Sequence, residues 1–374
     1  MLEAGIIGIG NAGSQVASLA LSENIDAVVM NSSENDLSTI PDTVIKFPLG
    51  DLRGAGKNRS EAKRFLKESI RKILEQESFI DFMDSKDVIF IISSTGGGTG
   101  SGMAPILSQI LKKSFPDTYI IIVGILPKID EAYSTQINTL EYMEELYKKM
   151  DNATYMLYDN EKLGNLPSHV MMEEINKSIV EDIKVLQGTY NHTTKYSSID
   201  EKDMSMIIST TGRIVIASYT DIKEKDLDII SIDQKLVRLL KEGTHAELQM
   251  DRIIKRSGVI ANLSPKMTES FDDHLSVLQR EIGSPVEEFT HVSINTEKVL
   301  KNNVFFIAAG LSPVIDRIEK INERVAEIES VQGDGDDIDE VLSVDISEAN
   351  SKRDYKEKKV EKTIDIKSIF DDFM

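Results

Sequence analysis

The sequence lacks cysteine, so it can form neither disulfide bonds nor a metal site made of thiolates. Its apolar runs all fall short of the roughly 18 residues needed to cross a membrane, and we expect no membrane partner. The first residues, Met1 to Gly5, lack the basic and then apolar order of a signal peptide, which favours a cytoplasmic protein. The histidines, five in all, are scattered without ligand-like spacing, so the chain offers no metal site of its own.

Basic residues are outnumbered by acidic ones. The chain of 374 residues has a formal net charge of −20, whereas binding to a nucleic-acid backbone requires clustered lysine and arginine. We therefore expect no direct binding to DNA, and any contact with it would run through an adaptor protein. The length suggests two domains plus extensions, and 40% hydrophobic with 28% charged residues is typical of a globular protein.

The first half of the chain alternates apolar runs with amphipathic stretches. The runs are rich in β-branched residues and almost unbroken, as expected for parallel strands buried on both faces. Helical patterns lie between them, among others at Ser60–Gln76 and Ala104–Ser114. Strand, glycine loop and helix in repeated order predict an α/β fold with a doubly wound parallel sheet. The predicted strands are Ala4–Ile9, Ala27–Asn31, Asp87–Ser94 and Tyr119–Leu126.

The second half begins with one long helix, predicted from near Ser168 to just before Gly188, which would connect two domains. Beyond it, further strands separated by helices indicate a second, smaller α/β domain. A helix over Pro313–Val331 has isoleucine and valine at helical spacing and is expected to pack back onto that second domain. The strands predicted for the second domain are Met204–Ile208, Ile214–Tyr219, Gly258–Leu263, His291–Ile294 and Val304–Ala309.

Two glycine loops each follow a buried strand and open a helix. Residues Gly8–Gly13 match GxGxxG, a spacing that serves phosphate binding at a helix N-terminus but also ordinary tight turns. The second loop, Ser93–Gly102, is built from glycine and small hydroxyl residues, so successive backbone N–H groups can surround a phosphate. The hydroxyls of Thr99 and Ser101 can add donors. The sequence has no GxxxxGK[ST] motif, which excludes a P-loop enzyme.

The segment Gly96-Gly97-Gly98-Thr99-Gly100-Ser101-Gly102 matches the signature G-G-G-T-G-[ST]-G of the tubulin and FtsZ superfamily, which the chain resembles over about residues 4–310. The resemblance implies a GTPase that polymerises head to tail and hydrolyses GTP between stacked subunits. GTP or GDP would be the bound nucleotide, with Mg²⁺ held through its phosphates. The implied organisation is a GTP-binding domain over 1–167, a connecting helix over 168–188, an activation domain over 189–312, a helix over 313–331 and an acidic tail over 332–374.

The resemblance also assigns contacts to the nucleotide. Lys57 is an added cation in the loop that senses the γ-phosphate, with a solvated loop lysine as the alternative. Glu131 stands where the family contacts ribose, although a carboxylate there can also stabilise a helix N-terminus. Thr135 stands where FtsZ proteins carry an arginine. The implied phosphate and ribose contacts are Gly10, Asn11, Ala12, Asn31, Ser32, Gly54, Gly56, Lys57, Gly96, Gly97, Gly98, Thr99, Gly100, Ser101 and Glu131.

The guanine base and the catalytic step are assigned in the same way. Asn160 and Asn176 match residues that read the guanine edge, and Met172 replaces an aromatic residue that stacks on the base. Met172 and Asn176 share one helix face, although a methionine on a helix is more often part of a core. Asp200 and Asp203 match the two acids that act on the nucleotide of the neighbouring subunit. They can orient and deprotonate water, whereas two acids at this spacing alone are usually a solvated turn.

We compare three functions: a polymerising GTPase, an oxidoreductase that uses a dinucleotide, and a filament regulator without GTPase activity. An oxidoreductase that uses a dinucleotide would need an acidic residue at the end of the second strand, where this chain has Asn31. A filament regulator without GTPase activity is disfavoured by Asp200 and Asp203. Within the superfamily, Thr135, Ser198 and a C-terminus without proline resemble the TubZ proteins of plasmids and phages, which move DNA through a centromere-binding adaptor. Cell division of the FtsZ type is the alternative.

The tail ends in a short amphipathic segment. Residues from the acidic linker to about Val360 alternate acid and base without an apolar face. Isoleucine and phenylalanine then recur from Ile366 to Phe373 at the spacing of one helical face. We expect this helix to dock on a neighbouring subunit or on an adaptor, with docking on its own subunit as the alternative. Removal of 351–374 should then leave GTP binding unchanged.

Overall fold

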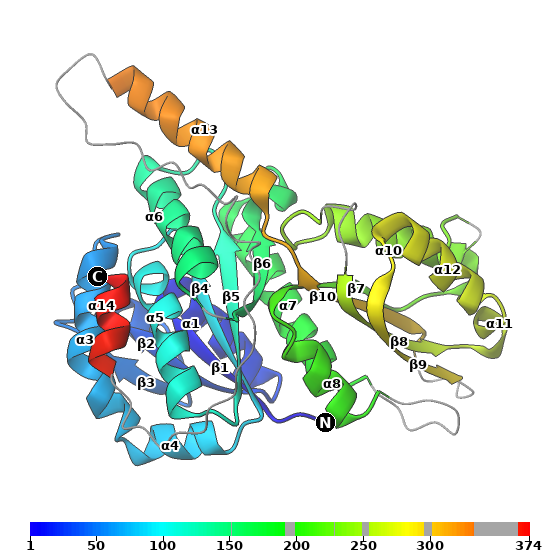
Figure 1. The fold of residues 1–374 in the computed structure, drawn as a ribbon, viewed down its shortest axis with the longest axis horizontal. Helices are drawn as coiled ribbons and strands as arrows, with labels where there is room; N and C mark the ends of the chain where they lie inside the picture. The colour runs from blue at the N-terminus through cyan, green and yellow to red at the C-terminus, as the bar shows by residue number, and fades with distance from the viewer. Residues whose placement is uncertain (151, 191–198, 228, 249–253, 295–300, 333–365) are drawn as a thin grey trace. The chain divides into compact units, whose positions relative to one another are not determined.

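The structure, a computed structural model, describes residues 1–150, 152–190, 199–227, 229–248, 254–294, 301–332 and 366–374 (Figure 1). They divide into two compact units, each considered by itself. The first unit comprises Gly5–Ala153 and Ile315–Met374, and the second comprises Met1–Ala4 and Thr154–Val314. As functional domains, the boundaries inferred above stay a prediction.

The first unit is built on parallel strands in the order β3-β2-β1-β4-β5. The pairs β1–β2, β2–β3 and β4–β5 are all parallel. Every residue of β1 is buried, as continuous apolar runs require in a sheet covered on both faces. The prediction of a doubly wound parallel sheet is confirmed here. The strands are β1 Ala4–Ile9, β2 Asp26–Asn31, β3 Ile45–Pro48, β4 Val88–Ser94 and β5 Tyr119–Leu126.

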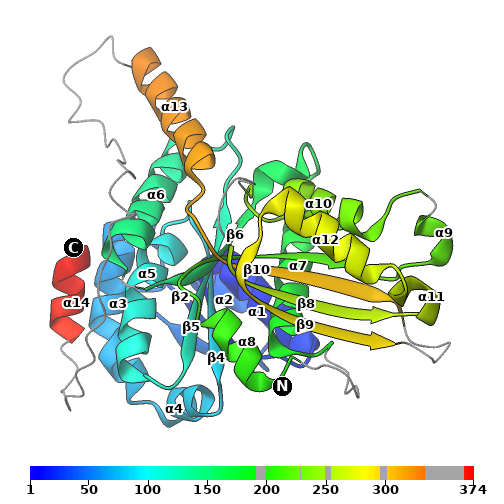
Figure 2. The same cartoon turned by 45° about the vertical axis from the view of Figure 1, so that its right-hand side comes forward.

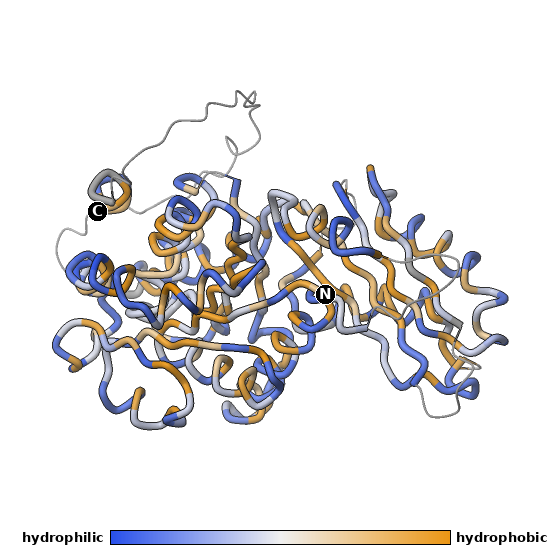
Figure 3. Tube along the Cα trace, turned by 90° about the horizontal axis from the view of Figure 1, so that it is seen from below, coloured by the Kyte–Doolittle hydropathy of each residue, from blue (hydrophilic) through white to orange (hydrophobic). Residues whose placement is uncertain are grey.

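Helices connect these strands and enclose them. The strands are largely hydrophobic in Figure 3, whereas the helices alternate hydrophobic and hydrophilic segments. The helix after β4 begins at Thr99, five residues before the predicted Ala104, because the end of the glycine-rich loop already forms its first turn. The helices are α1 Gly10–Ser22, α2 Glu34–Ser38, α3 Arg59–Leu74, α4 Glu77–Asp84, α5 Thr99–Ser114, α6 Tyr133–Glu144, the π-helix η1 Glu145–Lys149, α13 Ile315–Gln332 and α14 Ile366–Phe373.

The second unit contains strands in the order β6-β7-β10-β8-β9. Strand β10 runs antiparallel to both β7 and β8, and the pair β8–β9 is parallel. The strands are β6 Thr154–Asp159, β7 Gly212–Tyr219, β8 Ile254–Leu263, β9 Pro285–Ile294 and β10 Asn303–Leu311. The helices are η2 Asn160–Leu163, α7 Ser168–Gln187, α8 Glu201–Ile208, α9 Glu224–Leu227, α10 Ile232–Glu242, α11 Pro265–Thr268 and α12 Phe271–Ile282.

One predicted strand of this unit is wrong. Residues Met204–Ile208 belong to helix α8, which begins after Asp200. Asp200 caps the helix, and Asp203 completes a capping box by accepting a hydrogen bond from the Asp200 backbone. Met204, Ile207 and Ile208 are buried at i, i+3 and i+4. The short apolar run therefore reflects one helix face rather than a buried strand.

Helix α13 packs against α6 of the first unit. The hydroxyl of Tyr133 donates a hydrogen bond to Glu329 at 2.6 Å, and the guanidinium of Arg317 donates to the backbone carbonyl of Pro127. Ile318, Ile321 and Val325 are buried. The expectation that this helix packs onto the second domain is therefore wrong. The apolar face of α13 predicts that the helix packs against another surface, but it does not identify which surface that is.

Helix α14 forms as its apolar spacing predicted and packs against α5 and η1 of its own unit. Figures 1 and 2 both draw it beside α3. The side chains of Ile369, Phe370 and Phe373 are buried. In this structure the helix packs on its own chain, as the alternative expected, whereas docking on a neighbouring subunit or on an adaptor stays a prediction. The tail before it, residues 333–365, lies outside the described residues.

Candidate functional site

The first glycine loop is a tight turn between β1 and α1. Gly10 has φ +68°, a conformation that favours glycine. It is buried, whereas Asn11 is exposed and Ala12 is half-buried at the first turn of α1. The N–H groups of a first helical turn have no partner within the helix and attract anions. The turn can thus serve both packing and phosphate binding.

The glycine-rich loop lies beside the first one, between β4 and α5. A Cβ atom on Gly10 would lie 3.2 Å from the backbone nitrogen of Gly100, so the two loops are adjacent. A Cβ atom on Gly98 would lie 2.8 Å from Cα of Lys57. The missing side chain of Gly98 therefore leaves room for the backbone of the loop 54–58 rather than for phosphate alone. The glycines bring three backbone segments together.

The hydroxyl groups of this loop face different partners. Oγ1 of Thr99 lies 2.8 Å from Oγ of Ser32, so the structure brings the segment after β2 to the glycine-rich loop. Asn31 is buried, and its side chain binds the backbone of Ser33 and the carboxylate of Asp36. The hydroxyl of Ser101 donates to the carbonyl of Gly97 within the loop. A phosphate contact from Ser101 in this conformation would come from its backbone.

Lys57 is held in an unusual backbone conformation. Gly54, Gly56 and Lys57 have φ values of +85°, +56° and +60°, of which only the last falls on a residue that disfavours it. The Nζ atom of Lys57 donates to Oγ1 of Thr135 at 2.8 Å. The lysine is thus directed to the position where the resemblance would place an arginine. Strained residues of this kind concentrate at binding sites and switches.

Two residues that sequence reasoning missed tie these loops together. The amide of Asn138 on α6 donates to the carbonyls of Lys57 at 2.9 Å and of Gly97 at 3.1 Å. The guanidinium of Arg59 at the start of α3 donates to the carbonyl of Ser101 at 3.0 Å. Both side chains are buried and polar. Their partners lie 40 or more residues away in the sequence, so no local motif could indicate them.

Glu131 lies in the loop between β5 and α6. Its Oε1 accepts a hydrogen bond from the backbone nitrogen of Lys128 at 2.9 Å, and the side chain is half-buried. The carboxylate stabilises its own turn rather than the first turn of α6, which begins at Tyr133. A ribose contact by Glu131 stays a prediction.

The predicted guanine-reading residues belong to the second unit. Asn160 opens the short helix η2, which packs against α7. Met172 on α7 is 40% exposed, whereas its neighbour Met171 is buried. Asn176, one turn further, is half-buried. Met172 is therefore a surface methionine rather than a core residue, which is the arrangement that stacking on a base requires.

The predicted catalytic acids also belong to the second unit. The backbone nitrogen of Asp203 donates to Oδ1 of Asp200 at 2.9 Å, and that of Asp200 donates to Oδ2 of Asp203 at 3.3 Å. Asp200 is exposed and Asp203 half-buried. These bonds form a helix cap, and each uses one of two carboxylate oxygens. The catalytic role of the two acids stays a prediction. Ser198 lies outside the described residues.

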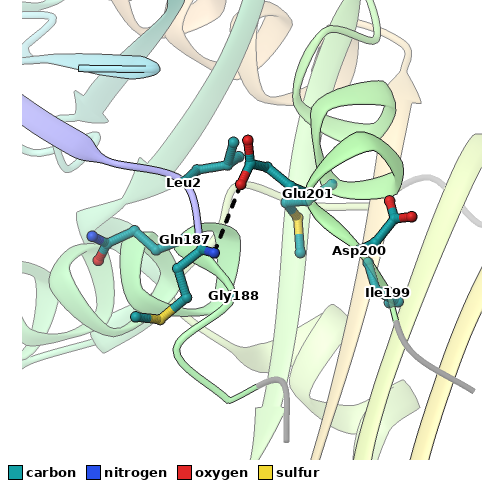
Figure 4. Close-up of a pocket in the computed structure, with 8 residues that line it drawn as sticks. Leu2, Gln187, Gly188, Ile199, Asp200 and Glu201 are labelled. Carbon is teal, nitrogen blue, oxygen red and sulfur yellow. Dashed lines mark ion pairs between the residues drawn. The ribbon is translucent and has the colours of Figure 1, made fainter. Parts of the chain in front are cut away.

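Asp200 lines a cavity of about 150 Å³ within this unit (Figure 4). The N-terminal ammonium of Met1 lies 3.9 Å from Oε2 of Glu201 at its edge. Within the described part of the chain, no three His, Asp or Glu side chains are arranged to hold a metal ion. Nor is any described helix long and apolar enough to cross a membrane. The lining residues are Met1, Leu2, Gln187, Gly188, Ile199, Asp200, Glu201 and Met204.

The sequence is similar to those of known proteins. Residues 3–167 match the family described as Tubulin/FtsZ family, GTPase domain. The tubulin-like protein CetZ of Pyrococcus furiosus is 25% identical over 294 residues, which cover 75% of this chain and 78% of that protein. The tubulin-like protein TubZ of Clostridium botulinum C phage is 21% identical and is covered, like this chain, over 98% of its length.

Solved structures show the same fold. CetZ2 from Haloferax volcanii, in a protofilament with bound GTPγS, superposes with a TM-score of 0.71 at 19% identity. The superposition covers 88% of this chain and all of that one. The α/β architecture predicted from the strand and glycine-loop order is thereby confirmed.

Proposed function

Residues 3–167 are a tubulin/FtsZ-family GTPase domain, and from this premise we propose that the chain binds GTP on its glycine loops and hydrolyses it in head-to-tail filaments. The observation that carries the proposal is the meeting of the loops 96–102, 54–58 and 10–12 with Ser32 in the first unit. The protofilament of CetZ2 with bound GTPγS supports it as a precedent for assembly with nucleotide.

The phosphates would lie at the first turns of α1 and α5. The backbone N–H groups of Gly10 to Ala12 and of Thr99 to Ser101 belong to the first turns of these helices, where the helix dipole is positive. Lys57 would leave Thr135 and pair with the γ-phosphate, while Glu131 would contact the ribose. Mg²⁺ bound to the phosphates would neutralise charge that develops during hydrolysis. Met172 would cover the base, and Asn160 and Asn176 would read its edge.

Hydrolysis would be completed by the acids of a second copy. Asp200 and Asp203 are accessible at the surface of their unit, where one carboxylate can orient a water and accept its proton. The water oxygen attacks the γ-phosphorus, the bond to the β-phosphate oxygen breaks, and GDP and phosphate leave. Each site would then require two subunits. Free subunits should be almost inactive.

The cellular role we propose is segregation of plasmid or phage DNA from a cytoplasmic filament. The net charge of −20 favours an adaptor protein that binds the centromere over direct contact with DNA. Similarity to TubZ over 98% of both chains supports this choice over division of the FtsZ type. A pull-down of purified chain with centromere DNA, with and without the product of an adjacent small DNA-binding gene, tests it. Binding to DNA without any adaptor contradicts this part of the proposal.

The shared site makes a quantitative prediction. GTP hydrolysis per subunit should rise steeply with protein concentration above a threshold, because only assembled subunits have a complete site. Phosphate release measured over a dilution series, with light scattering to report assembly, checks this. A hydrolysis rate per subunit that stays constant on dilution would exclude the shared site while leaving GTP binding intact.

A further inference from the structure

Helix α14 packs against a defined surface of the first unit, formed by α5 and η1. Ile369, Phe370 and Phe373 are at most 3% exposed, whereas Asp371 and Asp372 between them are exposed. The helix lies beside α3 in both views of the fold (Figures 1 and 2) and packs against α5 and η1. Hydrophobic residues on one face and acids on the other match a helix held by one surface.

Two lysines frame the aromatic residues of this helix. Nζ of Lys67 on α3 lies 5.6 Å from the ring centroid of Phe370. Nζ of Lys149 in η1 lies 5.7 Å from that of Phe373. Both distances are within the range of cation–π attraction. This surface therefore has electrostatic as well as apolar specificity for α14.

The end of α14 contacts a buried ion cluster. Nζ of Lys63 donates to the backbone carbonyl of Phe373 and, at 2.8 Å, to Oε1 of Glu145. The other oxygen of Glu145 accepts from the guanidinium of Arg59, which also binds Glu141 at 2.8 Å. The side chains of Arg59, Glu145 and Lys63 are 3%, 5% and 10% exposed.

The same cluster reaches the glycine-rich loop. Arg59 donates to the carbonyl of Ser101 at 3.0 Å, and a Cβ atom on Gly102 would lie 2.7 Å from the carbonyl oxygen of Arg59. Arg59 thus supports the loop through both its side chain and its backbone. An unbroken series of polar contacts runs from Phe373 through Lys63, Glu145 and Arg59 to Ser101.

The departure of α14 would change this series in a defined direction. Lys63 would lose the Phe373 carbonyl and gain water, which raises the local dielectric constant and weakens its attraction to Glu145. Glu145 would then bind Arg59 through one carboxylate oxygen, while Lys63 would hold its other oxygen less firmly. Arg59 would be free to shift, and the carbonyl of Ser101 would lose a donor that fixes the loop.

We propose that α14 is a regulatory element that, when docked, holds the glycine-rich loop in its nucleotide-binding conformation through Lys63, Glu145 and Arg59. The inference rests on the proposed function of that loop in GTP binding. Because coupling between two sites is reciprocal, bound nucleotide should strengthen docking by the factor by which docking strengthens nucleotide binding. A partner that captures α14 would then promote nucleotide release. This reverses the expectation that the tail is irrelevant to GTP affinity.

The first test removes the helix from this surface. A chain ending at residue 365 and a full-length Phe370→Asp, Phe373→Asp variant are compared with the parent. Affinity for GDP and for a GTP analogue that resists hydrolysis is measured by calorimetry below the assembly threshold. We expect both changes to weaken binding about fivefold or more, within the usual range for coupled sites. Full-length Asp371→Asn, Asp372→Asn is the matched control and should bind as the parent does.

The second test examines the relay. In full-length protein, Lys63→Met should weaken nucleotide binding, and removal of α14 from that variant should weaken it little further. Lys63→Arg, which keeps the charge, should restore most of the coupling. Hydrogen exchange of the α14 amides with and without nucleotide reports the reciprocal effect. A truncation effect of equal size in the parent and in Lys63→Met overturns the proposed route.

The outcomes separate this inference from the function on which it rests. If the full-length chain binds nucleotide and truncation leaves the affinity unchanged, the coupling is refuted while the GTPase function stands. If the full-length chain binds no nucleotide, the proposed function itself fails and takes the coupling with it. Circular dichroism of each variant establishes that weaker binding does not reflect unfolding.

Discussion

The glycine-rich loop of the first unit and the acidic loop of the second use charged side chains in opposite ways. Around the first, Arg59, Lys63 and Glu145 are buried, and Glu145 pairs with both cations. In the second, Asp200 is exposed and Asp203 half-buried, and their described bonds close a helix cap. Buried charges act by fixing structure, whereas accessible charges can meet a ligand. Variants should therefore affect stability first in one region and rate first in the other.

The acidic loop should show the largest effect. Asp200→Asn keeps a good N-cap but removes the basic oxygen, so GTP hydrolysis should fall about 10²–10⁴-fold with stability almost unchanged. Asp200→Ala removes the cap as well and should lose about 1 kcal/mol of stability in addition. Phosphate release and thermal unfolding measure the two effects. Parental hydrolysis in the Asn variant would contradict the catalytic assignment and leave only the cap.

The buried cluster should respond in stability. Glu145→Gln leaves Arg59 and Lys63 with too little negative charge, and breaking a buried pair in this way costs about 3–5 kcal/mol. Glu141→Gln is the matched control, because its side chain is 39% exposed and screened by solvent. That change should cost about 1 kcal/mol or less. Urea unfolding checks both, and equal losses would remove the distinction between the regions.

Lys57 combines both behaviours, because it is held by Thr135 yet proposed to meet phosphate. Lys57→Met should weaken GTP binding by about 1.5–3 kcal/mol, the cost of a lost hydrogen bond to a charged group. Binding of GDP should change less. Lys46→Met, which removes a lysine bound to Ile40 and Asp42, should leave both affinities unchanged. Equal losses for GTP and GDP would show that Lys57 does not contact the γ-phosphate.

The smallest effect concerns α13. The hydrogen bond to Glu329, together with burial, raises the pKa of Tyr133 to about 12. The protonated phenol therefore contributes stability below about pH 10, its usual pKa, and that contribution is lost as the pH rises through 12. Tyr133→Phe should cost about 0.5–1.5 kcal/mol at neutral pH, and the difference from the parent should shrink above pH 10. If the stability difference between the variant and the parent does not change with pH, the phenol proton of Tyr133 does not contribute to stability.

The sequence indicated most clearly those elements whose signal is local. The strands of the first unit are continuous apolar runs, and helix α7 ends at Gly188, which adopts the left-handed conformation of a helix C-cap. Met204–Ile208 shows the limit, because five apolar-rich residues satisfy a strand and one helix face equally well. The first turn of α5 was missed because glycine and serine have low helix propensity, although tertiary contacts fix them there.

The sequence by itself determined the parallel α/β order and the two glycine loops, because strand burial and turn chemistry are read within a few residues. Only the tertiary structure decided which surfaces α13 and α14 cover, that Gly98 admits the backbone of Lys57, and that Arg59 joins Glu145 to Ser101. These contacts join segments 40 or more residues apart. An amphipathic face or a buried charge reveals that a partner is needed, but chain topology chooses it.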